Sequence, residues 1–204
     1  MWQDDPSSPS LPGNASFSWL GKYLPEQRPL RILSVGCGLC REGEYLLEKG
    51  AELTGIDLDE VSLAKARHRM PQAVFHCRDA SQFEVPENQR FDVVLIRRPD
   101  IALHPQRWKQ ILIRSQHWLK GYGRVILTTP EKMEAQMIET WLQDMNHGEV
   151  IRMNENLEQE REVLVVNAAE VLNTPKPSPV LPLGVISWDD GEGLMCDLET
   201  GQCS

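Results

Sequence analysis

Short apolar segments alternate with helical patterns along most of the chain, and this alternation limits the possible folds more than any other feature. Five segments rich in Val, Ile and Leu are predicted strands, over residues 31–36, 52–57, 73–78, 91–96 and 124–129. Four of them are mostly apolar on both faces, as parallel strands covered on both sides are. Strand–helix–strand units of this length predict a parallel α/β sheet with right-handed crossovers.

Apolar stripes of helical period fill the gaps between these strands. They predict five helices, over residues 16–24, 42–49, 59–70, 108–119 and 130–145. Gly121 is expected to end the fourth of these helices, and Thr129 and Pro130 are expected to cap and begin the fifth.

The last two strands decide which kind of sheet this is. Residues 149–153 and 161–166 are predicted strands six and seven, and residues 154–160 join them. So short a connection excludes a parallel pair, which needs a crossover of about a dozen residues or more. The expected fold is therefore a three-layer, doubly wound α/β sheet of seven strands with the last strand antiparallel. A dehydrogenase of the dinucleotide-binding type has six parallel strands instead.

A Gly-x-Gly turn follows the first strand and suits a nucleoside-containing ligand. Gly36 and Gly38 allow a ligand to approach the backbone closely, and Asp57 ends the next strand, where a carboxylate can hold two ribose hydroxyls. The alternative for Asp57 is a helix cap. Arg41 stands where a dinucleotide turn has its third glycine, so a nicotinamide cofactor is not expected.

With these motifs, residues 31–167 resemble the class I S-adenosylmethionine-dependent methyltransferases. The resemblance implies that Gly36, Cys37 and Gly38 contact the methionine part of S-adenosyl-L-methionine. It implies further that Asp57 holds the ribose and that Leu58 lies beside the adenine. Transfer of a methyl group from this cofactor to an acceptor is the expected activity.

Two later motifs extend the resemblance. Arg78-Asp79-Ala80 matches the third motif of the family, where Asp79 would accept from the adenine amino group and Ala80 would lie next to it. An Asp at the end of a strand is otherwise a turn cap. Residues 91–96 match the fourth strand, whose end, at Ile96 and Arg97, would face cofactor and substrate.

The chain departs from the family pattern at two positions. Ser34 stands where family members usually carry an acidic residue, which predicts a weaker hold on the methionine end of the cofactor. Cys40 stands where a third glycine is common, which predicts a different loop shape. A protein that binds the cofactor without transferring its methyl group, and that acts through a partner, is therefore the alternative function.

The segment after the fourth strand supplies the candidates for acceptor binding and catalysis. Methyl transfer is an in-line displacement, so the enzyme mainly positions the acceptor and removes a proton. His104 or Asp100 could be that base, and Arg97 and Arg98 could bind an anionic acceptor. As surface residues, one arginine would instead face solvent, and the other would pair with Asp100 or with an acid of the C-terminal tail.

The distribution of charge along the chain limits which acceptors are expected. The net charge is −9, yet residues 97–124 hold seven basic residues and one acid. This segment is either a solvated helix face or an anion-binding patch. The acidic total argues against a nucleic acid partner, and the segment also lacks the Asn/Asp-Pro-Pro-aromatic sequence of amino-methylating nucleic-acid enzymes. A small-molecule or protein acceptor is expected.

The cysteines allow two other interpretations. Cys37 and Cys40 have the spacing of a dithiol redox motif, although four more strands and the ribose-type acid follow them. A zinc site combining this pair with Cys196 and Cys203 is not expected, because six residues separate the second pair. No metal is predicted.

The ends of the chain differ in composition from its middle. Residues 1–14 are predicted to be a disordered leader, 15–170 the cofactor-binding domain, and 171–204 a Pro-rich linker with an acidic hairpin. That hairpin would pack on its own domain or in the groove of a partner. Without a signal peptide or an apolar run long enough to span a membrane, the expected location is cytoplasmic.

Overall fold

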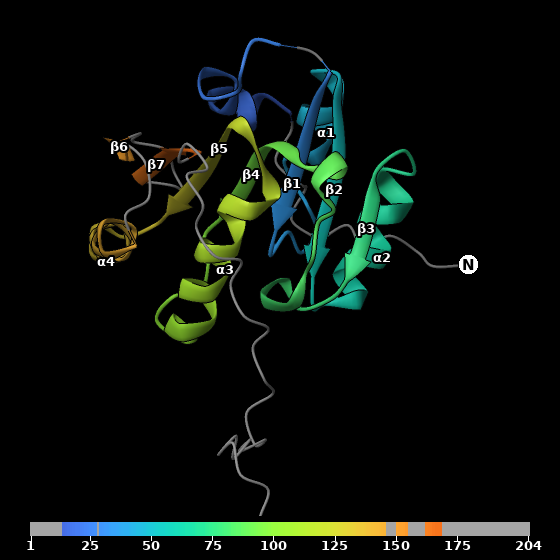
Figure 1. Cartoon of the computed structure of the whole chain (residues 1–204). Helices are drawn as coiled ribbons and strands as arrows, with labels where there is room; N and C mark the ends of the chain where they lie inside the picture. Colours follow the sequence, from blue (N-terminus) through green and yellow to red (C-terminus); the bar gives the residue numbers. More distant parts are fainter. Residues whose placement is uncertain (1–13, 28, 146–149, 155–161, 169–204) are drawn as a thin grey trace, which may run out of the picture.

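The computed structural model describes residues 14–27, 29–145, 150–154 and 162–168 (Figure 1). Within them, the strands form one sheet in the order β3-β2-β1-β4-β5-β7-β6. Their bounds are β1 (Leu30–Val35), β2 (Ala51–Asp57), β3 (Val74–Cys77), β4 (Phe91–Arg97), β5 (Leu119–Thr129), β6 (Val150–Asn154) and β7 (Glu162–Asn167). The predicted seven-stranded sheet is confirmed.

Strand directions follow the lengths of the connections. The first five strands pair in parallel, through β1 with β2 and β4, β2 with β3, and β4 with β5. Strand β7 pairs antiparallel with both β5 and β6. The connection between β6 and β7 is too short for a crossover, so β7 turns back and inserts between β5 and β6. The expected antiparallel last strand is confirmed.

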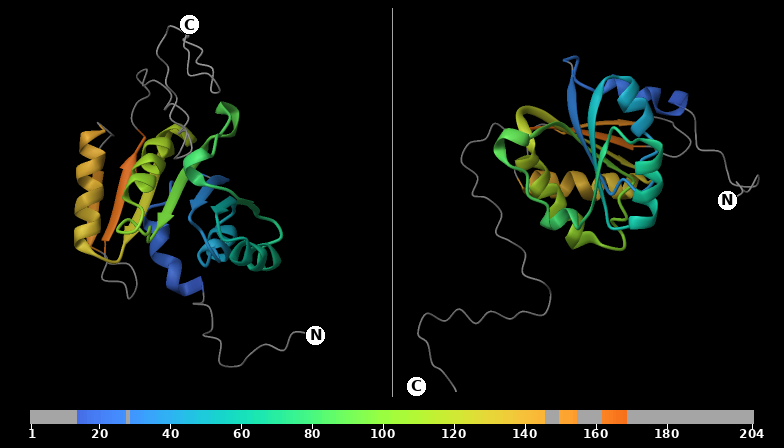
Figure 2. Two further views of the ribbon diagram at one scale, coloured as in Figure 1. Left: turned by 90° about the horizontal axis from the view of Figure 1, so that it is seen from below. Right: turned by 90° about the vertical axis from the view of Figure 1, so that its right-hand side faces the viewer.

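Helices cover both faces of this sheet. They are η1 (Asn14–Lys22), α1 (Gly43–Glu48), α2 (Glu60–Arg69), η2 (Ala80–Gln82), η3 (Glu87–Gln89), α3 (Pro105–Trp118) and α4 (Lys132–Asp144), where η marks a 3-10 helix. One core cluster joins η1, α1 and α2 to the sheet, and a second joins α3 and α4 to the opposite face (Figure 2). The three-layer arrangement is thereby confirmed.

Strand β4 shows why both faces are apolar. Val93 and Leu95 belong to the first core cluster, whereas Val94 and Ile96 belong to the second. Successive side chains of a strand point to opposite faces, so a strand covered on both sides needs apolar residues at every position. Burial of both faces therefore explains the near-continuous apolar run from which this strand was predicted.

Two predicted helix boundaries were wrong. Helix α3 ends at Trp118, and Gly121 lies inside β5, because the backbone enters the sheet at Leu119, which pairs with Phe91. Helix α4 has Glu131 as its N-cap. Thr129 is instead the last residue of β5, and its hydroxyl donates to the Glu131 carbonyl oxygen at 3.0 Å.

The predicted leader, except for Asn14, lies outside the described residues, and so does the whole of the predicted linker and hairpin at 171–204. Cys196 and Cys203 are part of that segment. In the part of the chain that the structure describes, the helices are too short or too polar to cross a bilayer.

Candidate functional site

A cavity of about 360 Å³ opens at the carboxyl ends of β1, β2 and β4. Parallel strands that run in one direction end at one edge of the sheet, so the loops after them meet there. Gly36, Asp57, Asp79, Arg98 and Trp108 contribute to its walls. This first cavity therefore lies where the sequence predicted a ligand.

A second cavity, of about 340 Å³, adjoins the first. It is lined by Cys37, Leu39, Arg41 and Glu42, and it shares Gly36, Arg97 and Arg98 with the first cavity. The shared residues are the glycine turn after β1 and the end of β4. Together the two cavities form one elongated site with charges of both signs.

Both glycines of the turn after β1 have a left-handed backbone conformation. Gly36 and Gly38 both have positive φ angles, +63° and +49°, which glycine adopts without steric cost. A Cβ atom on Gly36 would lie 3.1 Å from the Trp108 ring, so this position also lacks room for a side chain. The amide of Gly38 points toward β2 and donates to Asp57 Oδ2 at 2.6 Å.

Asp57 lines the first cavity and does not cap helix α2. Asp59 is the cap: its carboxylate accepts from the amides of Val61 and Ser62, and hydrogen bonding by Ser62 lowers its pKa. Asp57 instead accepts from the amides of Gly38 and Asp59, one on each oxygen. A carboxylate offers about four acceptor positions, so Asp57 keeps unused acceptor capacity at the cavity.

Leu58, Asp79 and Ala80 form a second part of the same wall. Leu58 is 55% exposed, which is unusual for a large apolar side chain and leaves it open to a flat apolar ligand. Asp79 caps η2 by accepting from Ser81 N at 2.8 Å, and its other oxygen lies 3.4 Å from Arg107. Asp79 is thus a turn cap that also lines the cavity.

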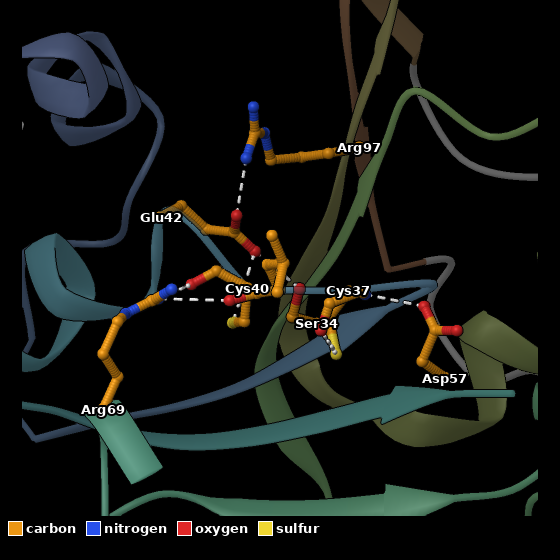
Figure 3. Close-up of polar contacts among 9 residues, drawn as sticks. Ser34, Cys37, Cys40, Glu42, Asp57, Arg69 and Arg97 are labelled. Atoms are coloured by element: carbon orange, nitrogen blue, oxygen red, sulfur yellow. Dashed lines mark hydrogen bonds and ion pairs between the residues drawn. The ribbon is translucent and has the colours of Figure 1, made fainter. Parts of the chain in front are cut away.

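The second cavity contains a buried carboxylate that sequence analysis missed. Glu42 is only 2% exposed and accepts from the Ser34 hydroxyl at 2.8 Å and from Arg97 Nη1 at 2.5 Å (Figure 3). The Cys40 thiol donates to the same carboxylate at 3.6 Å. An acid one turn after a glycine loop has no distinctive sequence signal, so only the fold identifies it.

Arg97 and Arg98 have different surroundings. Arg97 pairs with Glu42 and also lies over the Phe17 ring of η1, with 4.7 Å between Cζ and the ring centroid. The alternative prediction was that one of the two arginines pairs with an acid. Arg97 does so, although its partner is Glu42 rather than Asp100. Arg98 is exposed, has a φ of +50°, and has no side-chain partner among the described residues. Such a φ is an outlier for a bulky residue.

The two candidate bases lie together at the first cavity. His104 Nε2 is 3.7 Å from Asp100 Oδ2, and both side chains are about half exposed. Asp100 Oδ1 also accepts from the Trp108 indole at 2.5 Å. The tryptophan was predicted only as a core residue of its helix stripe, although a buried indole N–H needs an acceptor.

Two predicted site residues, Ile96 and Gly38, line neither cavity. Ile96 has no exposed surface and belongs to the core under α3 and α4. Gly38 contacts Asp57 through its backbone, and the remaining predicted cofactor and acceptor residues line one of the cavities.

The basic segment 97–124 is largely neutralised inside the fold. Arg114 pairs with Glu84 at 2.9 Å and Lys120 with Asp92 at 2.9 Å, beside the two arginine pairs described above. Four of the seven basic residues of this segment thus pair with acids in the fold. Among its arginines at the cavities, Arg98 is the one without an acidic partner in the described part of the chain.

Comparison with known proteins gives a family match over part of the chain and a shared fold. Residues 32–123 match the sequence profile of a family described as methyltransferase domain. Among curated proteins, none matches the sequence. In total, 1219 chains of solved structures match, and three of them are described next.

A TehB-like SAM-dependent methyltransferase from Corynebacterium glutamicum has 20% identity and a TM-score of 0.61, over 76% of this chain and 87% of that one. SAM-bound CalS10, an amino pentose methyltransferase from Micromonospora echinaspora, has 15% identity and a TM-score of 0.64, over 76% and 91%. DesVI from Streptomyces venezuelae has 14% identity and a TM-score of 0.65, over 76% and 92%. At such identities the likeness is one of fold.

Proposed function

We propose that this chain, whose residues 32–123 match a methyltransferase domain and whose fold is shared by SAM-dependent methyltransferases, is such an enzyme and methylates an anionic small molecule or protein. The observation that carries this proposal is the pair of adjoining cavities, one with the Asp57 carboxylate and the other with Glu42 and three arginines. The cofactor, S-adenosyl-L-methionine, supplies when bound a methyl group on a positively charged sulfur.

The first cavity fits the nucleoside part of this cofactor. Asp57 has unused acceptor positions for the two ribose hydroxyls, and its orientation is fixed by two backbone amides. Leu58 and Ala80 provide apolar surface for the adenine ring. Asp79 keeps acceptor capacity for the adenine amino group beyond its bonds to Ser81 and Arg107.

The second cavity fits the methionine part, which carries an ammonium and a carboxylate. Glu42 provides a buried negative charge for the ammonium, and Arg97 provides a positive charge for the carboxylate. The missing acid at Ser34 is then compensated, because Glu42 lies 2.8 Å from the Ser34 hydroxyl. The weaker cofactor binding expected from Ser34 does not follow if Glu42 takes over this role.

Arg98 is the residue that we assign to acceptor binding. It lies where the two cavities meet, and it holds an unfavourable left-handed backbone conformation there. Strain of this kind persists where the surrounding structure enforces it, which is common at ligand sites. The guanidinium matches a carboxylate or phosphate on the acceptor. His104, with Asp100 beside it, is placed to take a proton from that acceptor.

The acceptor class can be tested by turnover on a panel of carboxylate, phosphate, neutral and cationic compounds, with Arg98→Asn as the variant. Asparagine tolerates positive φ, so the backbone conformation is retained without the charge. We expect the KM for anionic acceptors to rise about 10- to 100-fold, as expected for loss of a charged hydrogen bond. The cofactor affinity should stay within error of the wild type.

Lys109→Gln is the matched control, because Lys109 is a nearby cation of α3 that lines neither cavity. A preference for neutral or cationic acceptors would refute the anionic assignment. Cofactor binding without turnover on any acceptor would favour the non-catalytic alternative.

A further inference from the structure

Two cysteines form one turn of the loop that connects β1 to α1. The amide of Cys40 donates to the carbonyl oxygen of Cys37 at 2.7 Å. A hydrogen bond from the fourth residue to the first keeps the two Cα atoms of a turn within about 7 Å. Disulfides form at Cα separations of about 4.4–6.8 Å. Both thiols are free, so the backbone already has the approximate spacing of a disulfide.

The two thiols differ in access. Cys37 is partly exposed and lines the second cavity, so a small oxidant can reach it. Cys40 is fully buried. Hydrogen bonding with the Cys37 thiol, followed by burial and the charge of Glu42, raises the pKa of Cys40 well above its ordinary value. Cys37 is thus the thiol that reacts first, and Cys40 is the sheltered neighbour.

The backbone at Cys40 is costly for a residue with a side chain. Its φ is +46°, in the left-handed region that glycine adopts freely. The buried thiol nevertheless contacts the Glu42 carboxylate, which in turn pairs with Arg97 (Figure 3). Oxidation of Cys40 would therefore remove a contact of the Glu42 carboxylate and so alter its ion pair with Arg97.

We propose that Cys37 and Cys40 form a reversible disulfide that weakens binding in the adjoining cavities. The oxidant is a peroxide. The Cys37 thiolate attacks one peroxide oxygen, the O–O bond breaks, and Cys37 becomes a sulfenic acid while hydroxide leaves and takes a proton to form water. The Cys40 sulfur then attacks the Cys37 sulfur, the S–O bond breaks, and a second water leaves with the Cys40 proton.

The consequence for binding rests on the proposed function. A sulfur–sulfur bond of about 2.05 Å replaces the thiol hydrogen bond of Cys40, so the Glu42 carboxylate loses one of its donors. The same loop carries the Gly38 amide that orients Asp57. Closing the disulfide thus disturbs both the methionine side and the ribose side of the site.

The experiment uses the full chain with Cys77, Cys196 and Cys203 replaced by serine, so that the pair holds the only thiols. After treatment with hydrogen peroxide, we expect both thiols to disappear together and the intact mass to fall by two hydrogen atoms. The dissociation constant of S-adenosylmethionine, measured by calorimetry, should rise about tenfold, as expected for a weakened charged hydrogen bond. A dithiol reductant should reverse both changes.

Cys40→Gly in the same background is the matched control, because glycine suits the left-handed backbone. Its intact mass should not fall by two hydrogen atoms after peroxide, because Cys37 then has no neighbouring thiol with which to form a disulfide. A mass gain by oxygen without loss of both thiols would overturn the disulfide. If the disulfide forms but the cofactor affinity stays unchanged, the proposal that it weakens binding is wrong. Failure of the reduced protein to bind cofactor would instead contradict the proposed function, and the thiol and mass measurements do not depend on it.

Discussion

Two backbone amides hold the Asp57 carboxylate at the edge of the first cavity, one from the glycine turn and one from the start of α2. This arrangement fixes the side chain without using all of its acceptor positions. In the proposed function this carboxylate binds the ribose, which needs both a fixed orientation and unused acceptor positions.

Asp57→Ala should therefore weaken S-adenosylmethionine binding by about 2–4 kcal/mol, since two charged hydrogen bonds are lost. Calorimetry gives the dissociation constant, and circular dichroism reports whether the fold persists. Glu52→Ala, an exposed acid at the opposite end of β2, is the matched control and should bind normally. A folded Asp57→Ala protein with wild-type affinity would contradict the role of this carboxylate.

Sequence predicted the residues of the site that belong to short motifs, and it missed those that the fold brings in from elsewhere. Gly36 and Gly38 follow β1 directly, and Asp57 ends β2 at a characteristic distance from them. Glu42 has no such spacing, and its importance comes from the arrival of Arg97 from a strand 55 residues away. The sequence did not identify Trp108 as a cavity residue, because its helical spacing is that of an ordinary core residue.

At the scale of elements, glycine at position 55 lets two strands and the glycine loop meet closely. A Cβ atom there would lie 2.5 Å from Phe75 Cδ1 on β3 and 2.9 Å from Cys37 Sγ. Phe75 is directly opposite Gly55 in the parallel register, so its ring covers the glycine. An aromatic ring fixed in this way cannot move aside cheaply.

Gly55→Ala should lower the free energy of unfolding by about 1–3 kcal/mol, the usual cost of overfilling a packed core. Urea denaturation followed by circular dichroism measures this change. Gly121→Ala is the control, because its added Cβ meets nothing within 4 Å. Equal stability of the two variants would show that β3 yields to relieve the contact.

Sequence predicted the order of the elements better than their ends. The strands were found because apolar residues on both faces leave a continuous run, and the antiparallel β7 followed from a connection too short for a crossover. The predicted end of α3, at residue 119, was one residue beyond Trp118, but Gly121 was wrong as the stop signal, because the backbone joins the sheet from Leu119 on. Pairing with a distant strand is not encoded in the local pattern.

The whole molecule is acidic, yet its basic segment lies beside the site. Most of those basic side chains pair with acids that are distant in sequence, such as Glu84 and Asp92. Charge counting along the sequence cannot anticipate these pairs, because only the fold determines which acids are near. The positive charge that we assign to acceptor binding is therefore the single side chain of Arg98, and not a broad basic surface.

In the proposed function the two adjoining cavities together bind S-adenosylmethionine. The most direct measurement is calorimetry of the reduced wild-type chain with S-adenosylmethionine, S-adenosylhomocysteine and NAD in parallel. We expect one site per chain for each of the first two ligands and no measurable heat from NAD, because Arg41 stands in place of the third dinucleotide glycine. Preference for NAD, or binding of none of the three, would contradict the account.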